Sequence, residues 1–417
     1  MNDTRETGKP RSWRRLALAS VTVLVLATVG VTWLAVAAPA PRGRGRVAAS
    51  GIAPSATRGT PGTHHYLYVF PDQAMWVYDI DHSHALVQHR AFPGVRGVRG
   101  VAFAPATRTL YVSFGNDRDG PGSLMAYDPV TDQAKWTRTY DFGIDSMAVS
   151  PDGRRIYMPT GELASGGTWH ILDAGNGDVL GSIEGGNGPH NTIASPDGSR
   201  VYLGGRNLDY LDVASAHSGQ VIERIGPLKA GVRPFTINGR QTLAFTTATG
   251  FLGFQVSSIA TGKVLFTRTF KGFGYNPDTF PATAPSHGIS LAPNEREVWV
   301  IDGPNSYVHV FSISRLPKRP PRLVANIRLP DRFSGEEAGC LYDCQRDGWL
   351  LHSRDGRYVY VGDSGDVLDA VRHRPVLELP ALRNSRTFLE IDWSNGSPVA
   401  TTTRSGLGYV GAPSSSS

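Results

Sequence analysis

The sequence has little cysteine, and several motifs of catalytic chemistry are missing from it. Only Cys340 and Cys344 occur in 417 residues, and no Cys-x-x-Cys-His segment is present, which excludes covalent haem attachment to this chain. The chain also has no Ser-His-Asp motif, no phosphate-binding glycine loop and no copper pattern of the Cys-His type. No complete catalytic motif is therefore apparent.

Net charge is also missing from most of the chain. Residues 1–46 hold eight Lys or Arg against Asp3 and Glu6, which accounts for the whole formal charge of +6 and leaves the remainder neutral. A domain that binds nucleic acid normally carries a basic surface. The body of the protein gives no electrostatic reason to expect DNA or RNA as a partner.

Charge is absent from residues 16–38, which form an apolar run of 23 residues. At about 1.5 Å per residue, a helix of this length spans a hydrocarbon core of roughly 30 Å. Arg11, Arg14 and Arg15 precede the run and favour a cytoplasmic position for residues 1–15. We expect residues 16–38 to be a transmembrane signal anchor, with a cleaved signal peptide as the alternative.

Both alternatives place the main domain outside the cytoplasm, either held at the cell membrane by a single span or secreted. Residues 39–63 are rich in Gly, Pro, Ala, Ser and Arg and predict a flexible linker. In an exported protein the close pair Cys340 and Cys344 favours a local disulfide. A zinc site would need further ligands nearby, and a thioredoxin-like role does not fit the C-x3-C spacing.

A repeated strand–turn–strand unit dominates the remainder. Residues 144–160 read IDSMAVSPDGRRIYMPT, in which an apolar strand, an S-P-D-G turn and a second strand follow one another. Related segments occur at residues 98–112, 189–203, 286–300 and 348–361, with a degenerate copy at 233–245. A spacing in the forties is typical of a four-stranded propeller blade.

The repeats resemble those of the YVTN-type (YncE-like, lactonase-like) propeller family. The resemblance rests on AVSPDGRRIY and IASPDGSRVY, each followed by an Asp-containing strand and a turn such as ATGKV or GNGDV, and covers roughly residues 65–400. It implies an all-β fold and does not fix a function, because similar propellers include lactonases, domains of haem and copper enzymes, and binding or surface-layer proteins.

We therefore predict a seven-bladed β-propeller over residues 64–411, followed by a disordered tail at 412–417. Residues 385–396, SRTFLEIDWSNG, supply an inner strand and a turn without a blade to follow. The first blade lacks such a strand. We expect the C-terminal strand to close the first blade, which removes an open sheet edge.

One position recurs with ionisable residues at the start of the inner strands, five residues before the turn serine or its equivalent. The side chains at this level are Arg99, Asp145, His190, Arg233 and His287, while blade seven has Gly348 and the closing blade about Phe388. Inner strands begin at the mouth of the central channel, so these five side chains form a candidate substrate-binding ring. Ordinary polar lining of a wet channel is the alternative interpretation.

The ring supports two hypotheses of function. The first hypothesis assigns no catalytic residue. It is a binding or protein-interaction module that recognises an unknown ligand or protein of the cell envelope. The second is a lactonase-like hydrolase or lyase, in which Asp145, His190 and His287 act as catalytic residues or bind a divalent metal ion. Arg99 and Arg233 would then bind an anionic substrate.

Two further groups of ionisable residues are weaker candidates. Glu390 and Asp392 lie two apart on one strand face, which suits acid–base chemistry but equally a role in the closing strand. The pair His64 and His65 precedes the first strand and is interpreted as the end of the linker.

Overall fold

The chain falls into two units, residues 1–50 and 51–417, and all described residues belong to the second. The computed structural model describes residues 62–280, 282–329, 333–342, 344–403 and 405–407. The predicted cytoplasmic segment, the membrane or signal helix, nearly all of the linker and the C-terminal tail lie outside these residues. Within the described part of the chain, no helix is long and apolar enough to cross a membrane.

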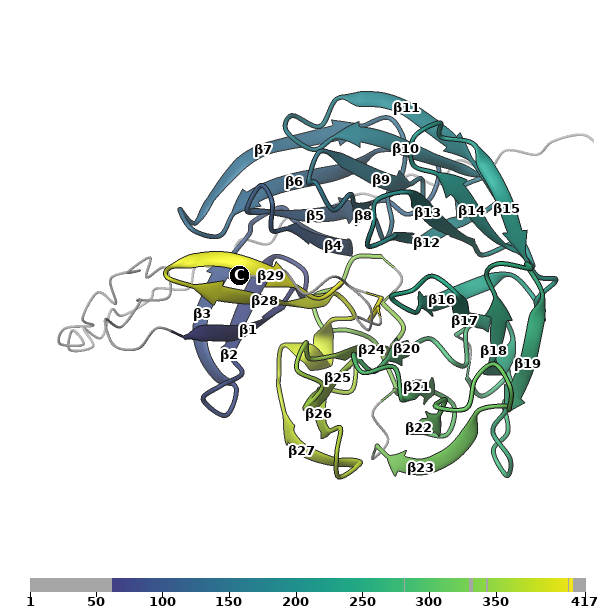
Figure 1. The fold of residues 1–417 in the computed structure, drawn as a ribbon. Coiled ribbons are helices and arrows are strands. Elements are labelled where there is room, and N and C mark those ends of the chain that lie inside the picture. Colours follow the sequence, from purple (N-terminus) through teal and green to yellow (C-terminus); the bar gives the residue numbers. More distant parts are fainter. Residues whose placement is uncertain (1–61, 281, 330–332, 343, 404, 408–417) are drawn as a thin grey trace, which may run out of the picture. The chain divides into compact units, whose positions relative to one another are not determined.

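The described residues form seven antiparallel sheets arranged as blades around a central axis (Figure 1). Blades two to seven each have four strands in sequence order, and the first strand of each lies nearest the axis. Inner strands of successive blades contact one another from blade one to blade seven. The prediction of an all-β seven-bladed propeller is confirmed.

The first four blades contain the strands up to residue 225. Blade one has β1 (Thr63–Val69), β2 (Ala74–Asp79) and β3 (Ala85–Ala91). Blade two has β4 (Val98–Ala104), β5 (Thr109–Gly115), β6 (Gly122–Asp128) and β7 (Gln133–Tyr140). Blade three has β8 (Ala148–Val149), β9 (Arg155–Pro159), β10 (Thr168–Asp173) and β11 (Val179–Glu184). Blade four has β12 (Pro189–Ala194), β13 (Arg200–Gly205), β14 (Leu211–Ser215) and β15 (Val221–Ile225).

The remaining blades follow the same plan. Blade five has β16 (Val232–Ile237), β17 (Leu243–Ala248), β18 (Phe251–Ser258) and β19 (Val264–Thr269). Blade six has β20 (Ile289–Leu291), β21 (Glu297–Asp302), β22 (Tyr307–Ser312) and β23 (Arg322–Arg328). Blade seven has β24 (Trp349–His352), β25 (Tyr358–Gly362), β26 (Asp366–Asp369) and β27 (Arg374–Glu378), and is followed by the short 3-10 helix η1 (Leu382–Asn384) and by β28 (Phe388–Ser394) and β29 (Ser397–Thr401).

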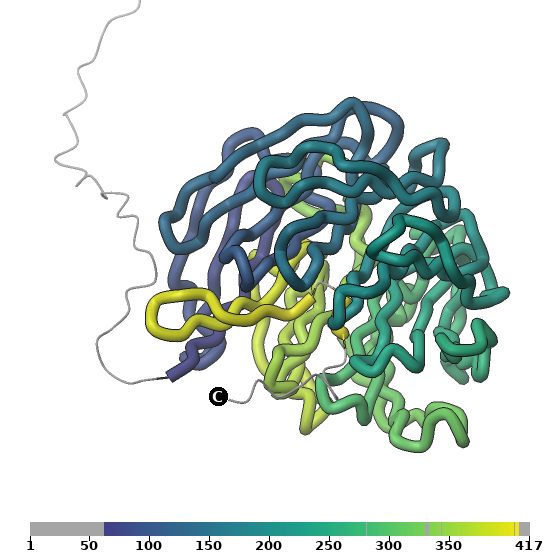
Figure 2. Tube along the Cα trace, turned by 45° about the horizontal axis from the view of Figure 1, so that its top comes forward, coloured from purple at the N-terminus to yellow at the C-terminus, as the bar shows by residue number. Residues whose placement is uncertain are grey.

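The ring closes through the C-terminal strands, as predicted. Strand β28 pairs antiparallel with β1, with Phe388 opposite Val69 and Ser394 opposite Thr63. Strand β29 adds a fifth strand to this sheet on the other side of β28, which was not predicted. Figure 2 shows the β28–β29 hairpin with its turn at the outer edge of the propeller and its open end toward the middle.

Alternation along the strands explains why the blades stack. Successive side chains of a strand point to opposite faces, so each blade can present apolar residues to both neighbours. In β9, Ile156 and Met158 pack toward blade two, whereas Tyr157 between them packs with Trp169 and with Leu203 of blade four. Each of the seven junctions between adjacent blades contains such a buried cluster among the described residues.

The S-P-D-G turn recurs because its serine and aspartate satisfy the backbone of the corner. In blade three the Ser150 hydroxyl donates to Asp152 Oδ1 at 2.5 Å and accepts from the Arg155 amide at 3.0 Å. Gly153 has φ +70°, a conformation that other residues rarely adopt. Blades four and seven repeat the serine–aspartate hydrogen bond.

The predicted strand at the start of residues 144–160 is shorter than its apolar pattern indicates. Pairing in β8 covers only Ala148 and Val149. Upstream, the Asp145 carboxylate accepts a hydrogen bond from the Ser146 amide at 2.7 Å, and the Ile144 amide donates to the Asn116 carbonyl. These bonds divert the backbone from the sheet ladder just where Asp145 enters the channel.

One end of the channel is covered by the chain that follows β29. The carbonyl of Gly406 accepts hydrogen bonds from Thr236 Oγ1 at 2.8 Å and from the Leu291 amide at 3.2 Å. Leu407 is buried against Ile193 and Val232. A cavity of about 210 Å³ remains between this segment and the inner strands of blades two to four.

Candidate functional site at the channel mouth

The ring of predicted site residues lies at the opposite mouth of the channel. All five side chains are buried, and Arg99, Asp145, His190 and His287 line one cavity of about 20 Å³. A cavity of this size holds about one water molecule. Arg233 joins the same group of charges through Glu162, so the structure brings the five residues together around a very small space.

Glu162 is the centre of one half of this mouth. It follows β9 and is 3 % exposed. Its carboxylate accepts from Arg233 Nη1 at 2.5 Å and from Arg99 Nη2 at 3.2 Å, and Arg206 Nη1 lies 3.3 Å from it. One carboxylate of blade three thereby contacts guanidinium groups of blades two, four and five.

Asp145 and Asp117 complete this half. Arg99 Nη2 lies 3.5 Å from Asp145 Oδ2 and 3.4 Å from Asp117 Oδ2. His190 Nδ1 lies 3.1 Å from the same Asp145 oxygen. Nε2 of His190 is buried and has no hydrogen-bond partner among the described residues.

The second half of the mouth is organised by Asp347 and Arg386. His287 Nδ1 lies 3.0 Å from Asp347 Oδ1 and 3.0 Å from the Gly348 carbonyl. Arg386 Nη1 donates to Asp347 at 2.7 Å, and its Nε donates to Glu337 at 3.0 Å. The buried Asp363 accepts from the backbone amides of residues 347 and 348 through Oδ2.

These contacts shift the ionisation of the buried groups. Burial alone would raise the pKa of Glu162, but Arg233, His190, Arg99 and Arg206 outweigh it and hold that pKa well below its usual range. Burial also acts to raise the pKa of Asp145, and there Arg99 and His190 reverse the direction. Burial lowers the pKa of His287, and the neighbouring Asp347 opposes the shift only in part. At neutral pH the mouth therefore holds carboxylates paired with guanidinium groups.

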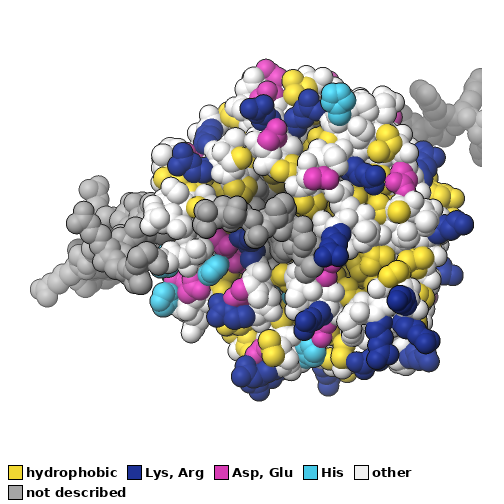
Figure 3. Space-filling view, in the orientation of Figure 1, with side chains coloured by type: hydrophobic (Ala, Val, Ile, Leu, Met, Phe, Trp, Pro, Cys, Tyr) yellow, Lys and Arg dark blue, Asp and Glu magenta, His cyan; other side chains and the backbone are white. Residues whose placement is uncertain are grey.

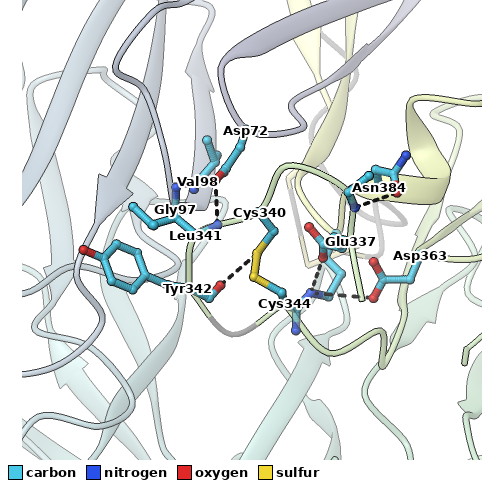
Figure 4. Close-up of a disulfide and its surroundings, with 12 residues drawn as sticks. Asp72, Gly97, Val98, Glu337, Cys340, Leu341, Tyr342, Cys344, Asp363 and Asn384 are labelled. Atoms are coloured by element: carbon cyan, nitrogen blue, oxygen red, sulfur yellow. Dashed lines mark hydrogen bonds and ion pairs between the residues drawn. A yellow bond between two sulfur atoms is a disulfide. The ribbon is translucent and has the colours of Figure 1, made fainter. Parts of the chain in front are cut away.

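A loop closed by a disulfide covers this mouth (Figure 4). The sulfur atoms of Cys340 and Cys344 are bonded, and Cys340 and Tyr342 line the small cavity. The Leu341 amide donates to Asp72 Oδ2 at 3.1 Å, which attaches the loop to blade one. On its other side, the Ala338 amide donates to Asn384 Oδ1 at 3.0 Å.

The predicted metal ligands are arranged only partly as a ligand set. Asp145 and His190 are in contact, but His287 directs Nδ1 to Asp347 and Gly348, and the two imidazole rings are 6.0 Å apart. Among the described residues, the cluster with three ligand atoms within 4.8 Å of one another is His65, Glu390 and Asp392.

That cluster joins the first strand to the closing strand. His65 Nδ1 lies 2.8 Å from Asp392 Oδ1 and 3.4 Å from Glu390 Oε1. Hydrogen bonding to Glu390, together with Asp392, raises the pKa of His65 to about 9 against the effect of burial. Arg354 Nη1 binds the second oxygen of Asp392 at 2.5 Å. Two cationic groups already neutralise these carboxylates, so the cluster fits a role in ring closure. His64 and His65 both lie within β1 and pair with β28, so the interpretation of this pair as the end of the linker is wrong.

A second depression lies on the side of the propeller and was not predicted. It is a groove of about 700 Å³ between β19 of blade five and β22 and β23 of blade six. Five basic residues and no acidic residue line it; they are Arg268, Lys271, Arg315, Arg319 and Arg322. Arg268 and Lys271 lie at the end of β19, and Arg315 and Arg319 lie in the connection between β22 and β23. The blade repeat does not mark these four positions in the sequence.

Comparisons with known proteins assign no family to this chain. No protein-family model and no curated protein sequence matches the chain. Among solved structures, hydrazine synthase of Kuenenia stuttgartiensis is similar, with 17 % sequence identity over 66 % of this chain and 78 % of that chain, and a TM-score of 0.49. At this level of similarity, nothing about chemistry is transferred from that enzyme.

Proposed function

We propose that this chain is a binding or interaction module of the YVTN-type propeller class, held outside the cytoplasm by its N-terminal segment. The observation that carries the proposal is the contrast between the channel mouth and the groove on the side of the propeller. The channel mouth is closed by a loop and its charges are paired, whereas the groove on the side of blades five and six is large and basic. Grooves of several hundred Å³ are of the size that binds ligands.

The interaction partner is a component of the cell envelope, since the predicted anchor brings the propeller to the outer face of the membrane. The rigid ring of seven packed junctions would present the groove without rearrangement on binding. This proposal requires neither a metal ion nor a reactive side chain.

The test compares binding with catalysis in the purified full chain. We expect saturable binding of an envelope component that is lost when groove arginines are replaced, and no hydrolysis of lactones or esters above the buffer rate. Hydrolysis that disappears in His190→Gln, in a variant whose unfolding temperature is unchanged, would overturn the proposal.

A lactonase-like hydrolase or lyase is the second candidate function, and one observation favours it. His190 is held by the Asp145 carboxylate through Nδ1, and its buried Nε2 has no described partner. An imidazole positioned in this way can serve as a general base. The loop that contains Cys340 and Cys344 would have to move before a substrate could enter. A divalent metal ion that copurifies with the full chain and is lost in a His190→Gln, His287→Gln double variant would support this candidate.

A further inference from the structure

The groove between blades five and six differs from the channel mouth because its basic side chains are not paired with carboxylates among the described residues. At the mouth, the guanidinium groups of Arg99, Arg233 and Arg386 contact carboxylates. In the groove, no described carboxylate lies within 4.0 Å of any of the five basic side chains, which are Arg268, Lys271, Arg315, Arg319 and Arg322. A set of unpaired cations on one surface attracts an anionic partner.

This concentration of charge is local. The sequence beyond residue 46 carries equal numbers of acidic and basic residues, so a surface with five cations and no anion departs from the average of the domain. Figure 3 shows Lys and Arg side chains gathered over the part of the molecule where Figure 1 places β19 and β23. Lys271, Arg315, Arg319 and Arg322 are exposed.

The floor of the groove is aromatic. Phe270, His309 and Phe311 are buried at its base, with the rings of Phe270 and His309 4.0 Å apart. Phe273 is half-buried and meets the edge of His309 at 4.7 Å between ring centroids. A side chain that enters between the cations would therefore meet an apolar surface, which favours an aromatic or large aliphatic group.

One wall of the groove is the outer edge of a sheet. Strand β23 pairs with β22 and is the last strand of its sheet, so its other edge has no strand partner among the described residues. Leu323 and Val324 on this strand are 43 % and 39 % exposed. An extended polypeptide can add to such an edge through backbone hydrogen bonds, which a polysaccharide or a nucleic acid cannot supply in the same register.

We infer that this groove binds an acidic segment of a partner protein that carries an aromatic or large aliphatic side chain. Carboxylates of the segment pair with the cations of the rim, the apolar side chain packs on the aromatic floor, and the backbone lies along β23. The inference rests on the proposed function, because it names the partner class of the same groove.

The experiment uses the full chain and a fluorescein-labelled peptide of repeated Glu-Glu-Phe units in fluorescence anisotropy. Two comparison peptides replace Glu by Gln or Phe by Ala. The groove variant is Arg315→Glu combined with Arg322→Glu, and the matched control is Arg108→Glu combined with Arg374→Glu, two exposed arginines of blades two and seven with the same total change of charge. Dextran sulfate serves as an anionic polymer without a peptide backbone.

We expect the Glu-Glu-Phe peptide to bind wild type and the control pair alike, and to bind the groove variant about tenfold or more weakly, because two attractive contacts become repulsive. The Gln peptide and the Ala peptide should both bind more weakly than the parent. Phe273→Ala should weaken the binding of the parent peptide and leave the binding of the Ala peptide unchanged.

Two results would overturn the inference. Equal losses of peptide affinity in the groove variant and in the control pair would show that net charge alone attracts the peptide. Dextran sulfate that binds through Arg315 and Arg322 while the peptides do not would exclude a protein segment, yet would leave the propeller a binding module. If neither probe binds, the inference fails, and the assays of envelope binding and hydrolysis decide the proposed function separately.

Discussion

Arg233 and Glu162 are joined by a hydrogen bond of 2.5 Å, although they belong to blades five and three and both are buried. The same carboxylate contacts Arg99 of blade two and Arg206 of blade four. Four blades are thus connected at the channel mouth by a single side chain. Because a buried charge is stable only when it is compensated, this residue holds the mouth in its observed arrangement.

Replacing Glu162 by Gln should destabilise the folded protein strongly. The substitution keeps the shape of the side chain but leaves several buried guanidinium groups short of one negative charge, and breaking a buried ion pair in this way costs about 3–5 kcal/mol. The free energy of unfolding from urea titration measures the loss. Glu184→Gln, at an exposed position of β11, is the control and should change stability by no more than about 0.5 kcal/mol. Equal effects of the two substitutions would contradict the role of Glu162.

The repeats made the fold predictable from the sequence. Strand–turn–strand copies with S-P-D-G corners fixed the blades, and their common register placed Arg99, Asp145 and His190 at one level of the channel. The alternation of apolar residues also predicted buried strands, and residues 385–396 predicted ring closure. Strand β29 was missed because its sequence, SPVAT, has no apolar alternation and is only partly buried.

The partners of the ring residues were missed because they come from loops. Asp117 and Glu162 contact ring residues, and Arg206 and Asp363 lie in the same charged groups. All four follow the second strand of their blade by one to three residues, with a Gly one or two positions before each. Because the number of residues after the strand differs from blade to blade, no fixed spacing identifies these four residues in the sequence. The cations of the basic groove also follow no repeat, because they come from β19, from the start of β23 and from the connections beside these strands.

The stability of the protein should fall in mildly acidic solution, and His352 should contribute to the fall. Burial lowers the pKa of His352 from the ordinary 6.5 to about 3. The unfolded chain then binds the proton more readily, so the stability is fully present above pH 6.5 and is lost as the pH falls below it toward 3. The linkage between proton binding and folding predicts that His352 alone lowers the free energy of unfolding by about 2 kcal/mol between pH 7.5 and pH 5.

The measurement is the free energy of unfolding at both pH values in wild type and His352→Gln, which should lose about 2 kcal/mol less than wild type on acidification. Ser290→Ala is the control, because Ser290 Oγ contacts His352 Nδ1 at 2.8 Å but does not titrate. The free energy of unfolding of Ser290→Ala should differ from that of wild type by the same amount at both pH values. Parallel curves for wild type and His352→Gln would refute the assignment.

Asp72 should control the attachment of the disulfide loop to the mouth. Its carboxylate accepts hydrogen bonds from the amides of Gly97 at 2.8 Å, Val98 at 3.0 Å and Leu341 at 3.1 Å. In Asp72→Ala these amides lose their acceptor, and each such charged bond contributes about 1.5–3 kcal/mol. Hydrogen exchange at the three positions should accelerate about tenfold or more.

The control for this experiment is Asp141→Ala, an exposed position at the end of β7 that makes no contact with the loop. Exchange at Gly97 and Leu341 should be unchanged in it. Faster exchange at Gly97 and Val98 with unchanged exchange at Leu341 would mean that the loop is attached independently of Asp72, through Asn384 and Arg386.

Gly406 should be sensitive to the smallest side chain, because it lies where the C-terminal segment crosses the end of the channel. Its φ is +60°, and an added Cβ would lie 2.3 Å from Ser290 Oγ. Gly396 in the β28–β29 turn has φ +74° with nothing within 4 Å of such a Cβ, which makes it a matched control for the backbone strain alone. Gly396→Ala should cost about 1 kcal/mol, and Gly406→Ala should cost about 1–3 kcal/mol more because the Cβ displaces packed atoms. Thermal and urea unfolding of the two variants measure the difference. If it is close to zero, the segment around Gly406 does not pack against blade six, and the closure of this end of the channel must rest on Thr236 and Leu407.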